Sequence, residues 1–545
     1  MIRSISGKQE ILADLEKRVN DKILEQSNFD LLKKLIENAD NLDEAIKIAE
    51  LGTTYKRTGF HFDKRLEKTS NTITYFKKND TLSFITDKEA ITHKLIVGDN
   101  YPALLNLLIE YKGKIDVIYI DPPYGKDSMG EFAATNYDNA ITRDNLLSML
   151  YPRLYVAKQL LSDRGVIFCS IDDKNQAYVK CLFDEIFEER NFCGNIIWNS
   201  TKSVTNTALI SVSHTYNLVY FKNINYYITN RTEFRLPDDG EGFENPDNDP
   251  RGAWKADPFQ VGGWRPNQQY VITNPNTGVE YTPNPGCSWK NDFNKFQELL
   301  EDNRIVFGKT GEGGPQRKRF IWEAEERGKV AKTLWDSVGT TWDDVGTTTN
   351  GTQQIKRIFD DASIFDNPKP VDLIIKMLQL STKRNSIVLD FFAGSGTTGQ
   401  AVLELNQKYD DCRQFIGVQL DEDLDFALEK DKKNQTIKEQ IALCNKYGRP
   451  HNLSEITAER LRRVMTGKDF LGKNLEWAKN NVPLGGNLLV LDIANVANFE
   501  AVAGKTAFDV IDETLYGHEK FKTVKEKVEW VCNNFEVTQK RLEEE

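Results

Sequence analysis

Hydrophobic residues follow two alternating patterns along the middle of this chain. Short apolar runs such as HKLIVGD (93–99) and IDVIYID (115–121) are typical of buried strands. Between them lie segments whose apolar residues recur every three or four positions, as in NYPALLNLLIEYKGK (100–114). Strands that alternate with helices in this way predict an α/β fold, in which a parallel sheet is covered by helices on both faces.

The alternation breaks between about residues 224 and 330 and then resumes. This segment is rich in Pro, Gly, Asn and aromatic residues, and strand-like pieces such as QYVIT predict a mostly β or irregular insertion. The first 50 residues have helical periodicity, which indicates a segment for self-association or partner docking. We therefore predict an N-terminal association segment (1–90), the first half of the α/β domain (91–223), the insertion (224–330), the second half of the domain (331–439) and a C-terminal accessory region (440–545).

The composition is that of a globular protein. Hydrophobic residues make up 39% of the 545 positions, and no apolar run is long enough to cross a bilayer. The first residues, MIRSISGKQE, lack the apolar stretch of a secretory signal, so we expect a cytoplasmic protein without a membrane partner. The seven cysteines form no C-x-x-C pair, which argues against a disulfide framework, and we predict no metal site.

The net charge of −11 limits how this protein could bind nucleic acid. Coating of nucleic acid through general electrostatics requires positive charge, which the chain as a whole lacks. A DNA-reading enzyme remains compatible with the composition, because only the charge that lines the contact groove matters.

The stretch IVLDFFAGSGTTGQ (387–400) joins a predicted strand to a predicted helix through a glycine-rich turn. Gly394, Gly396 and Gly399 have the G-x-G-x-x-G spacing of nucleotide-binding loops. A phosphate loop of the Walker A type is excluded because no Gly-Lys-Ser/Thr follows. Two interpretations remain: a loop for the pyrophosphate of a nicotinamide or flavin cofactor, or a loop for the methionine part and ribose of S-adenosylmethionine.

A second stretch, IDVIYIDPPYGKD (115–127), ends a buried strand in a carboxylate. Asp121 is expected at the C-terminal edge of the sheet, where open α/β folds bind their ligands. Pro122 and Pro123 fix the backbone dihedral φ of two consecutive residues. The result is a stiff loop that holds Asp121 and the ring of Tyr124 in a set geometry, and we predict these four residues as the catalytic site.

The DPPY tetrapeptide (121–124) and the stretch DFFAGSGT (390–397) together resemble the motif pair of amino-group DNA methyltransferases. The catalytic tetrapeptide precedes the cofactor loop and an insertion separates them, which is the permuted order of the β class. FDNPKPVDLIIKML (365–378) resembles that family's helix motif on the cofactor side. Over roughly residues 55–430 the chain is similar to the modification subunits of Type III restriction–modification systems, with further matches in THKLIVGDNYPALL, TLWDSVGT and PQRKRFIWE.

This resemblance implies a Rossmann-like, S-adenosylmethionine-dependent methyltransferase domain with an inserted target-recognition domain. Asp121 and the Pro122 carbonyl group would accept hydrogen bonds from the adenine amino group, which turns the nitrogen lone pair toward the methyl donor. Tyr124 would stack on the target base after that base is flipped out of the duplex. Asp in the first position favours adenine N6, since cytosine-N4 enzymes of this kind more often carry Ser there.

The predicted cofactor contacts lie on several separate segments of the chain. Glycine allows close approach, the threonines lie at a helix N-terminus with free N–H groups, and Lys369 would reach the cofactor carboxylate. Where many related enzymes have an acidic residue for the ribose, this chain has Gln419, with Asp421 two residues later, and which of them binds stays open. The predicted cofactor residues are Asp99, Asn100, Lys369, Asp390, Phe392, Ala393, Gly394, Ser395, Gly396, Thr397, Thr398, Gln419 and Asp421.

Aromatic and basic residues of the insertion are candidate DNA contacts, since Arg reads base edges and basic side chains hold phosphates. The predicted DNA-binding residues are Trp264, Arg265, Arg317, Lys318 and Arg319. The resemblance also implies double-stranded DNA as substrate, a homodimer and a separate restriction subunit as partner. The alternatives are a stand-alone β-class adenine or cytosine-N4 methyltransferase, an RNA methyltransferase, a non-catalytic DNA-binding subunit and a NAD-dependent oxidoreductase.

Overall fold

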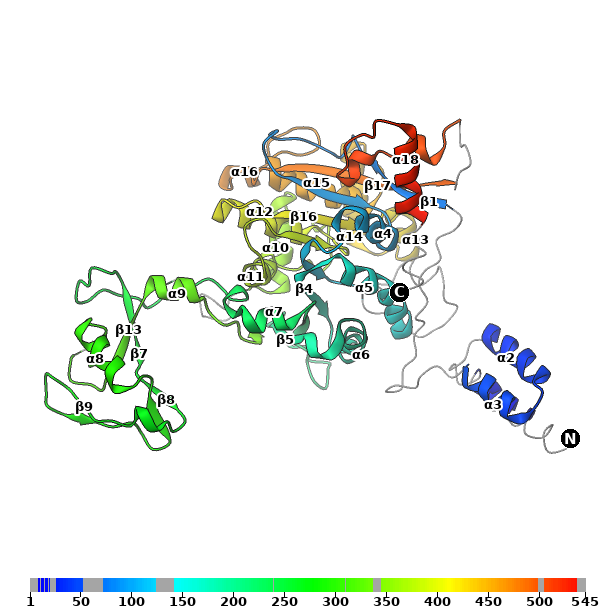
Figure 1. The fold of residues 1–545 in the computed structure, drawn as a ribbon. Coiled ribbons are helices and arrows are strands. Elements are labelled where there is room, and N and C mark those ends of the chain that lie inside the picture. Colours follow the sequence, from blue (N-terminus) through cyan, green and yellow to red (C-terminus); the bar gives the residue numbers. More distant parts are fainter. Residues whose placement is uncertain are drawn as a thin grey trace.

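In the computed structural model, one ten-stranded sheet organises most of the chain (Figure 1). The structure describes residues 26–51, 72–123, 142–238, 240–308, 310–336, 345–497 and 504–536, together with parts of 8–19. In spatial order the strands are β1 (Thr72–Lys78), β17 (Asn487–Ala497), β2 (Thr92–Val97), β16 (Gln414–Gln419), β15 (Ile387–Asp390), β3 (Ile115–Ile120), β4 (Leu161–Ile171), β6 (His214–Phe221), β5 (Phe192–Asn199) and β14 (Leu334–Trp335). All run in one direction except β1 and β6. The predicted α/β fold with a largely parallel sheet is confirmed.

The central strands separate two hydrophobic cores. On β3, Val117 and Tyr119 belong to one core while Ile118 and Ile120 belong to the other, because successive side chains of a strand point to opposite faces. Both faces are buried, which is why these strands read as continuous apolar runs. The first core includes α10 (Thr348–Ile358), α11 (Val371–Ser381), α12 (Thr397–Tyr409), α14 (Gln435–Tyr447) and α15 (Leu453–Thr466); the second includes α4 (Asn100–Tyr111), α5 (Thr142–Leu160), α6 (Gln176–Phe183), α17 (Ala507–Val510) and α18 (Val524–Val531).

The chain beyond residue 440 contributes directly to this body. β17 pairs in parallel with β2, from Asn487 opposite Thr92 to Asp492 opposite Val97, so it lies inside the sheet. α15 packs into the same core as α11 and α12. The predicted boundary at 439/440 therefore does not separate two cores, and the other predicted boundaries stay predictions. Two short helices, α13 (Leu424–Lys430) and α16 (Trp477–Asn480), complete this part.

The insertion has a small core of its own and projects away from the sheet, at the left of Figure 1. Phe259, Trp289 and Phe296 are buried in that core, so these aromatic side chains support the fold. The strands are short, which agrees with the irregular pattern of the sequence. They are β7 (Trp254–Pro258), β8 (Gln260–Gly262), β9 (Ile272–Thr273), β10 (Glu280–Tyr281), β11 (Cys287–Trp289), β12 (Ile305–Val306) and β13 (Gln316–Phe320), accompanied by α8 (Phe293–Glu301) and α9 (Ile321–Arg327). The preceding helix α7 (Ile224–Thr229) packs on the main body, where its Tyr227 belongs to the same core as α11.

Residues 26–51 of the N-terminal segment form helices, whereas residues 72–78 form β1 of the large sheet. α2 (Gln26–Asn38) and α3 (Leu42–Leu51) pack on each other over Phe29, Ile36 and Ala45. Across the described parts of the whole chain, no helix combines the length and the apolar character that a bilayer span requires.

Candidate active site

Four polar segments meet at the carboxyl edge of the sheet, where β2, β16, β15 and β3 are neighbours. These strands are parallel, so the residues at their C-terminal ends emerge along one edge. The segments are 98–100, 121–123, 390–398 and 419–421. The structure thus brings together predicted catalytic and cofactor-binding segments that lie far apart in the sequence.

Hydrogen bonds to Asp390 close the glycine loop between β15 and α12. Its carboxyl group accepts one bond from the Phe392 backbone N–H at 3.0 Å and one from the Thr398 hydroxyl at 2.6 Å. Gly394 and Gly396 have φ values of 52° and 81°, in the left-handed region that favours glycine. Both oxygens of Asp390 are therefore engaged within the loop that they shape, and its contact with a cofactor stays a prediction.

The outer surface of this loop is open to close approach. A side chain at Gly394 would meet only the Phe392 carbonyl oxygen, 3.7 Å from the position of its Cβ. The Ala393 N–H donates to the Val418 carbonyl at 3.0 Å and fixes the loop against β16. The ring of Phe392 is half-buried, with its centre 5.2 Å from that of Phe391. A rigid, glycine-lined turn beside an aromatic ring fits the adenosyl and methionine parts of S-adenosylmethionine.

Helix α15 supports the glycine loop through a buried arginine. Arg460 donates to the carbonyl and hydroxyl oxygens of Ser395 at 3.0 and 2.7 Å, and to the Thr397 hydroxyl at 2.8 Å. A further bond reaches the Gln400 side chain at 2.8 Å. Burial lowers the pKa of Arg460 to about 9, so the guanidinium stays cationic at neutral pH. The hydroxyl groups of Ser395 and Thr397 thus point into the protein, where they anchor the loop to Arg460.

A second residue of α15 acts in the same way. The Thr457 hydroxyl donates to the Gly394 carbonyl at 2.6 Å. Thr457 and Arg460 lie three residues apart and therefore on one face of the helix. Sequence reasoning missed both, because neither belongs to a recognisable motif and each has its role only through a distant loop.

Asp121 and Lys369 form an ion pair at the centre of the site. The Lys369 ammonium donates to Asp121 Oδ2 at 2.6 Å, while Oδ1 is buried and has no hydrogen-bond partner among the described residues. Pro122 is buried and Pro123 half-buried directly after this carboxylate, and Tyr124 lies outside the described residues. The contact of Lys369 with a cofactor stays a prediction; the contact seen is with Asp121, whose catalytic role is likewise a prediction.

Asp99 and Asn100 link the end of β2 to the glycine loop. The Asp99 carboxylate caps α4 by accepting from the Tyr101 N–H at 2.7 Å, and the Asn100 amide donates to the Phe391 carbonyl at 2.8 Å. The fully buried Arg153 donates to both, at 3.1 Å to Asp99 Oδ1. Arg153 is a further residue that the sequence does not reveal, since it lies in the apolar stretch of α5.

Gln419 and Asp421 differ in the hydrogen bonds that their side chains already make. The Asp421 carboxylate accepts hydrogen bonds from the Ser454 hydroxyl and, at 2.8 Å, from the Asn452 amide. Gln419 is buried, and its amide nitrogen donates to the neighbouring Leu420 carbonyl at 3.1 Å. Both residues lie at the carboxyl end of β16, and the choice between them as ribose contact stays open.

The predicted DNA contacts of the insertion fall into two groups. Trp264 is 68% exposed, and the adjacent Arg265 is exposed, with its guanidinium donating to the Gln268 side chain at 3.3 Å. Arg317 and Arg319 are half-buried and form ion pairs with carboxylates of the insertion, at 3.1 and 3.0 Å. Trp264 and Arg265 are therefore placed for an external contact, whereas the two arginines are already paired.

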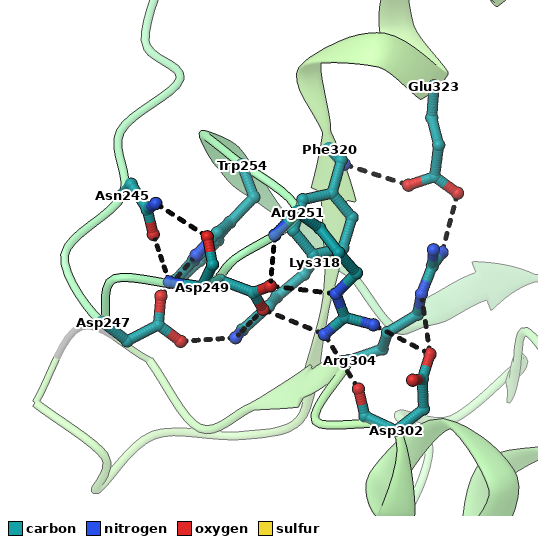
Figure 2. A network of polar contacts seen from close by, with 10 residues as sticks. All are labelled: Asn245, Asp247, Asp249, Arg251, Trp254, Asp302, Arg304, Lys318, Phe320 and Glu323. Atoms are coloured by element: carbon teal, nitrogen blue, oxygen red, sulfur yellow. Dashed lines mark hydrogen bonds and ion pairs between the residues drawn. The ribbon is translucent and has the colours of Figure 1, made fainter.

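Lys318 lies in the interior of the insertion. It is fully buried and pairs with Asp247 and, at 3.0 Å, with Asp249. Its ammonium lies 5.0 Å from the centre of the Trp254 ring, and Arg251 donates two bonds of 2.9 Å to Asp249. Figure 2 shows these side chains as parts of one network. A phosphate contact by Lys318 would require both of its ion pairs to break, so its predicted DNA contact has no support in this geometry.

The network predicts that Lys318→Met destabilises the protein without changing how DNA binding depends on salt. Loss of the ammonium leaves a buried carboxylate partly unpaired, which we expect to cost ~3–5 kcal/mol of unfolding free energy. Thermal unfolding and the salt dependence of DNA affinity measure the two effects. Arg265→Ala is the matched control, with lower DNA affinity and an unchanged melting temperature. A Lys318→Met protein with wild-type stability and a shallower salt slope would contradict the structure.

The buried Asp390 predicts a pH-dependent stability. Burial raises the pKa of this carboxyl group from 3.8 to about 7. Well below its unfolded pKa of 3.8 the group is protonated in both states; between about pH 4 and about pH 7 only the unfolded chain ionises, so stability falls by up to ~4 kcal/mol. The melting temperature of Asp390→Asn, relative to wild type without ligand, should therefore rise between about pH 4 and about pH 7 and level off above that range. A melting-temperature difference that does not change with pH would contradict a buried Asp390 carboxyl group with a raised pKa.

Comparison with known proteins agrees with this geometry. A family model described as DNA methylase matches residues 115–425, a range that contains both the DPPY stretch and the glycine loop. A second model, described only as an uncharacterised conserved protein, matches residues 8–117.

Curated relatives match about two thirds to three quarters of the chain. The Type III restriction–modification enzyme StyLTI Mod subunit of Salmonella typhimurium is 31% identical over 467 residues, which cover 78% of this chain and 64% of that protein. The EcoP15I Mod subunit of Escherichia coli is 28% identical over 433 residues, 68% of this chain and 63% of that protein. The Type II methyltransferase M.KpnI of Klebsiella pneumoniae is 29% identical over 430 residues, 73% of this chain and 94% of that protein.

This chain thus spans less than two thirds of the length of the two Mod subunits. The family model, in contrast, covers more than half of the chain and includes the whole carboxyl edge from β3 to β16. The protein belongs to the DNA methylase family.

Proposed function

We propose that this protein transfers a methyl group from S-adenosylmethionine to N6 of adenine in double-stranded DNA, as the modification subunit of a Type III restriction–modification system. The observation that carries the proposal is the free acceptor in the site: Asp121 Oδ1 is buried and without a hydrogen-bond partner among the described residues, beside the glycine loop of a DNA methylase. A buried acceptor is costly unless something donates to it. The exocyclic amino group of a flipped adenine is a donor of the required kind.

The chemistry follows from the poor nucleophilicity of that amino group, whose lone pair is delocalised into the ring. Asp121 Oδ1 and the Pro122 carbonyl would accept its two N–H bonds and so direct the lone pair at the methyl carbon. S-adenosylmethionine, when bound, supplies the methyl group on a positively charged sulfur, which keeps the electron pair of the broken S–C bond. Asp121 Oδ1 and the Pro122 carbonyl would hold the amino nitrogen while it gains the methyl group, and the proton that this nitrogen loses would pass to solvent.

Lys369 positions Asp121 for this task. Its ammonium occupies Oδ2 at 2.6 Å and leaves Oδ1 for the base. An ammonium has three donors, so the same group would also bind the cofactor carboxylate, as the sequence predicts. The glycine loop, Asn100 and Gln419 or Asp421 would hold the rest of the cofactor. The nicotinamide alternative has no support, because the matched family is one of DNA methylases.

Adenine specificity and the Type III assignment rest on two supports. Asp121 occupies the position that favours adenine, and two of the relatives are Mod subunits of Type III enzymes. We infer double-stranded DNA, a second copy of the chain and a restriction subunit as partners. A stand-alone methyltransferase is the second candidate, favoured by the match that covers 94% of M.KpnI. Co-purification of a protein that cuts unmethylated DNA would separate the first candidate from the second.

The proposed role of Asp121 predicts a specific defect. Asp121→Ala removes the side-chain acceptor, so we expect kcat for methyl transfer to duplex DNA to fall about 100-fold or more. Binding of S-adenosylmethionine, measured by equilibrium dialysis, should change by no more than a few-fold. Asp372→Asn, at an exposed carboxylate on α11, is the matched control and should keep wild-type activity. Undiminished transfer by the Asp121 variant would refute the assignment.

A further inference from the structure

The loop between β5 and β6, residues 200–213, presents large apolar side chains to solvent. Leu209 and Ile210 are 105% and 86% exposed, and Val204 and Val212 flank them at 73% and 56%. Two adjacent, fully exposed aliphatic residues gain nothing from the fold around them. Clusters of this kind on a folded surface mark a contact with another molecule.

Hydrogen bonds give this loop a defined shape. At its base, the Ser213 carbonyl accepts from the N–H groups of Ser200 and Thr201 at 3.0 and 3.2 Å. Nearer the tip, the Thr205 N–H donates to the Ser211 hydroxyl at 2.9 Å. The loop, here called the finger, is therefore closed on itself by hydrogen bonds while its apolar residues stay exposed.

The finger extends from the same edge of the sheet as the catalytic carboxylate. β6 is antiparallel to both β4 and β5, and β4 is parallel to β3. β5 therefore runs in the same direction as β3, and both strands end at the edge of the sheet where Asp121 lies. The finger leaves the sheet after Asn199 and returns at His214. The insertion, in contrast, follows β6 and returns through β14, and so begins and ends at the opposite edge. The finger, unlike the insertion, thus leaves the sheet at the edge where Asp121 lies.

The charge of the finger fits a polyanion. Residues 200–213 contain one lysine, seven serine or threonine residues and no acidic residue, in a chain whose net charge is −11. Hydroxyl, amide and ammonium groups are the usual donors to DNA phosphates. The polar groups of the finger could bind the phosphates on the outside of a duplex. Its apolar tip could contact the stacked base faces inside.

We propose that Leu209 and Ile210 enter the duplex beside the target adenine and fill the space that it leaves when it is flipped out. This inference rests on the proposed function. Flipping has an unstacking cost, and apolar side chains that insert between base steps in other proteins replace part of the lost stacking contact. The two residues would act as positioning residues, without contact to the methyl group or to the cofactor.

The test compares two DNA substrates that contain the recognised site. In one the target adenine faces thymine; in the other it faces an abasic position, so that flipping is already easy. For Leu209→Ser/Ile210→Ser we expect kcat/KM to fall roughly tenfold or more on the paired site and to stay within about threefold of wild type on the abasic site. The fluorescence of 2-aminopurine at the target position should rise on binding of wild type and much less with the variant.

Two controls isolate the finger. Leu471→Ser makes the same change at a leucine that is 69% exposed beyond the far end of α15, and it should behave as wild type on both substrates. Leu209→Met/Ile210→Leu keeps the apolar tip and should restore activity on the paired site.

Three results would overturn the proposal: unchanged activity of the serine variant on the paired site, an equal loss on both substrates, or an altered oligomeric state with an unchanged 2-aminopurine signal. The last would show that the finger contacts a protein. Wild-type protein that methylates neither substrate would instead refute the proposed function, and this inference with it.

Discussion

The parallel pairing of β15 with β3 is the contact on which the site depends. Val388 lies opposite Val117 and Leu389 opposite Ile118, all four fully buried. This pairing joins two halves of a domain that the insertion separates in the sequence. Because strands paired in parallel end at one edge, it brings the DPPY loop next to the glycine loop. A slip of one residue would exchange the faces of these side chains between the two cores, so the cores fix the register.

The glycine loop is held both by Asp390 within it and by side chains of α15 packed against it. A buried guanidinium is costly unless its donors are satisfied, and Arg460 is satisfied by the loop's own carbonyl and hydroxyl groups. The helix that carries Arg460 precedes β17, which lies inside the same sheet. The C-terminal part of the chain thus contributes to the shape of the predicted cofactor loop.

Local patterns in the sequence predict the features that depend on local chemistry. Apolar runs buried on both faces indicate the parallel strands, and the prolines and glycines set the backbone of their own loops. The patterns do not indicate β6, which is antiparallel, or residues whose role depends on a distant partner. Arg460 acts through a loop about 60 positions earlier, and Lys318 stands in a basic run yet is buried against two aspartates. Tyr124 lies outside the described residues, so its stacking role stays a prediction.

Single-molecule sequencing of DNA from cells that express this protein tests the central claim most directly, because it reports the modified base and its sequence context together. The account predicts N6-methyladenine at one short sequence, absent from cells that express Asp121→Ala. Methylation of cytosine N4 would contradict the assigned base. No new modified base, from a protein that is folded and binds S-adenosylmethionine, would contradict the account as a whole.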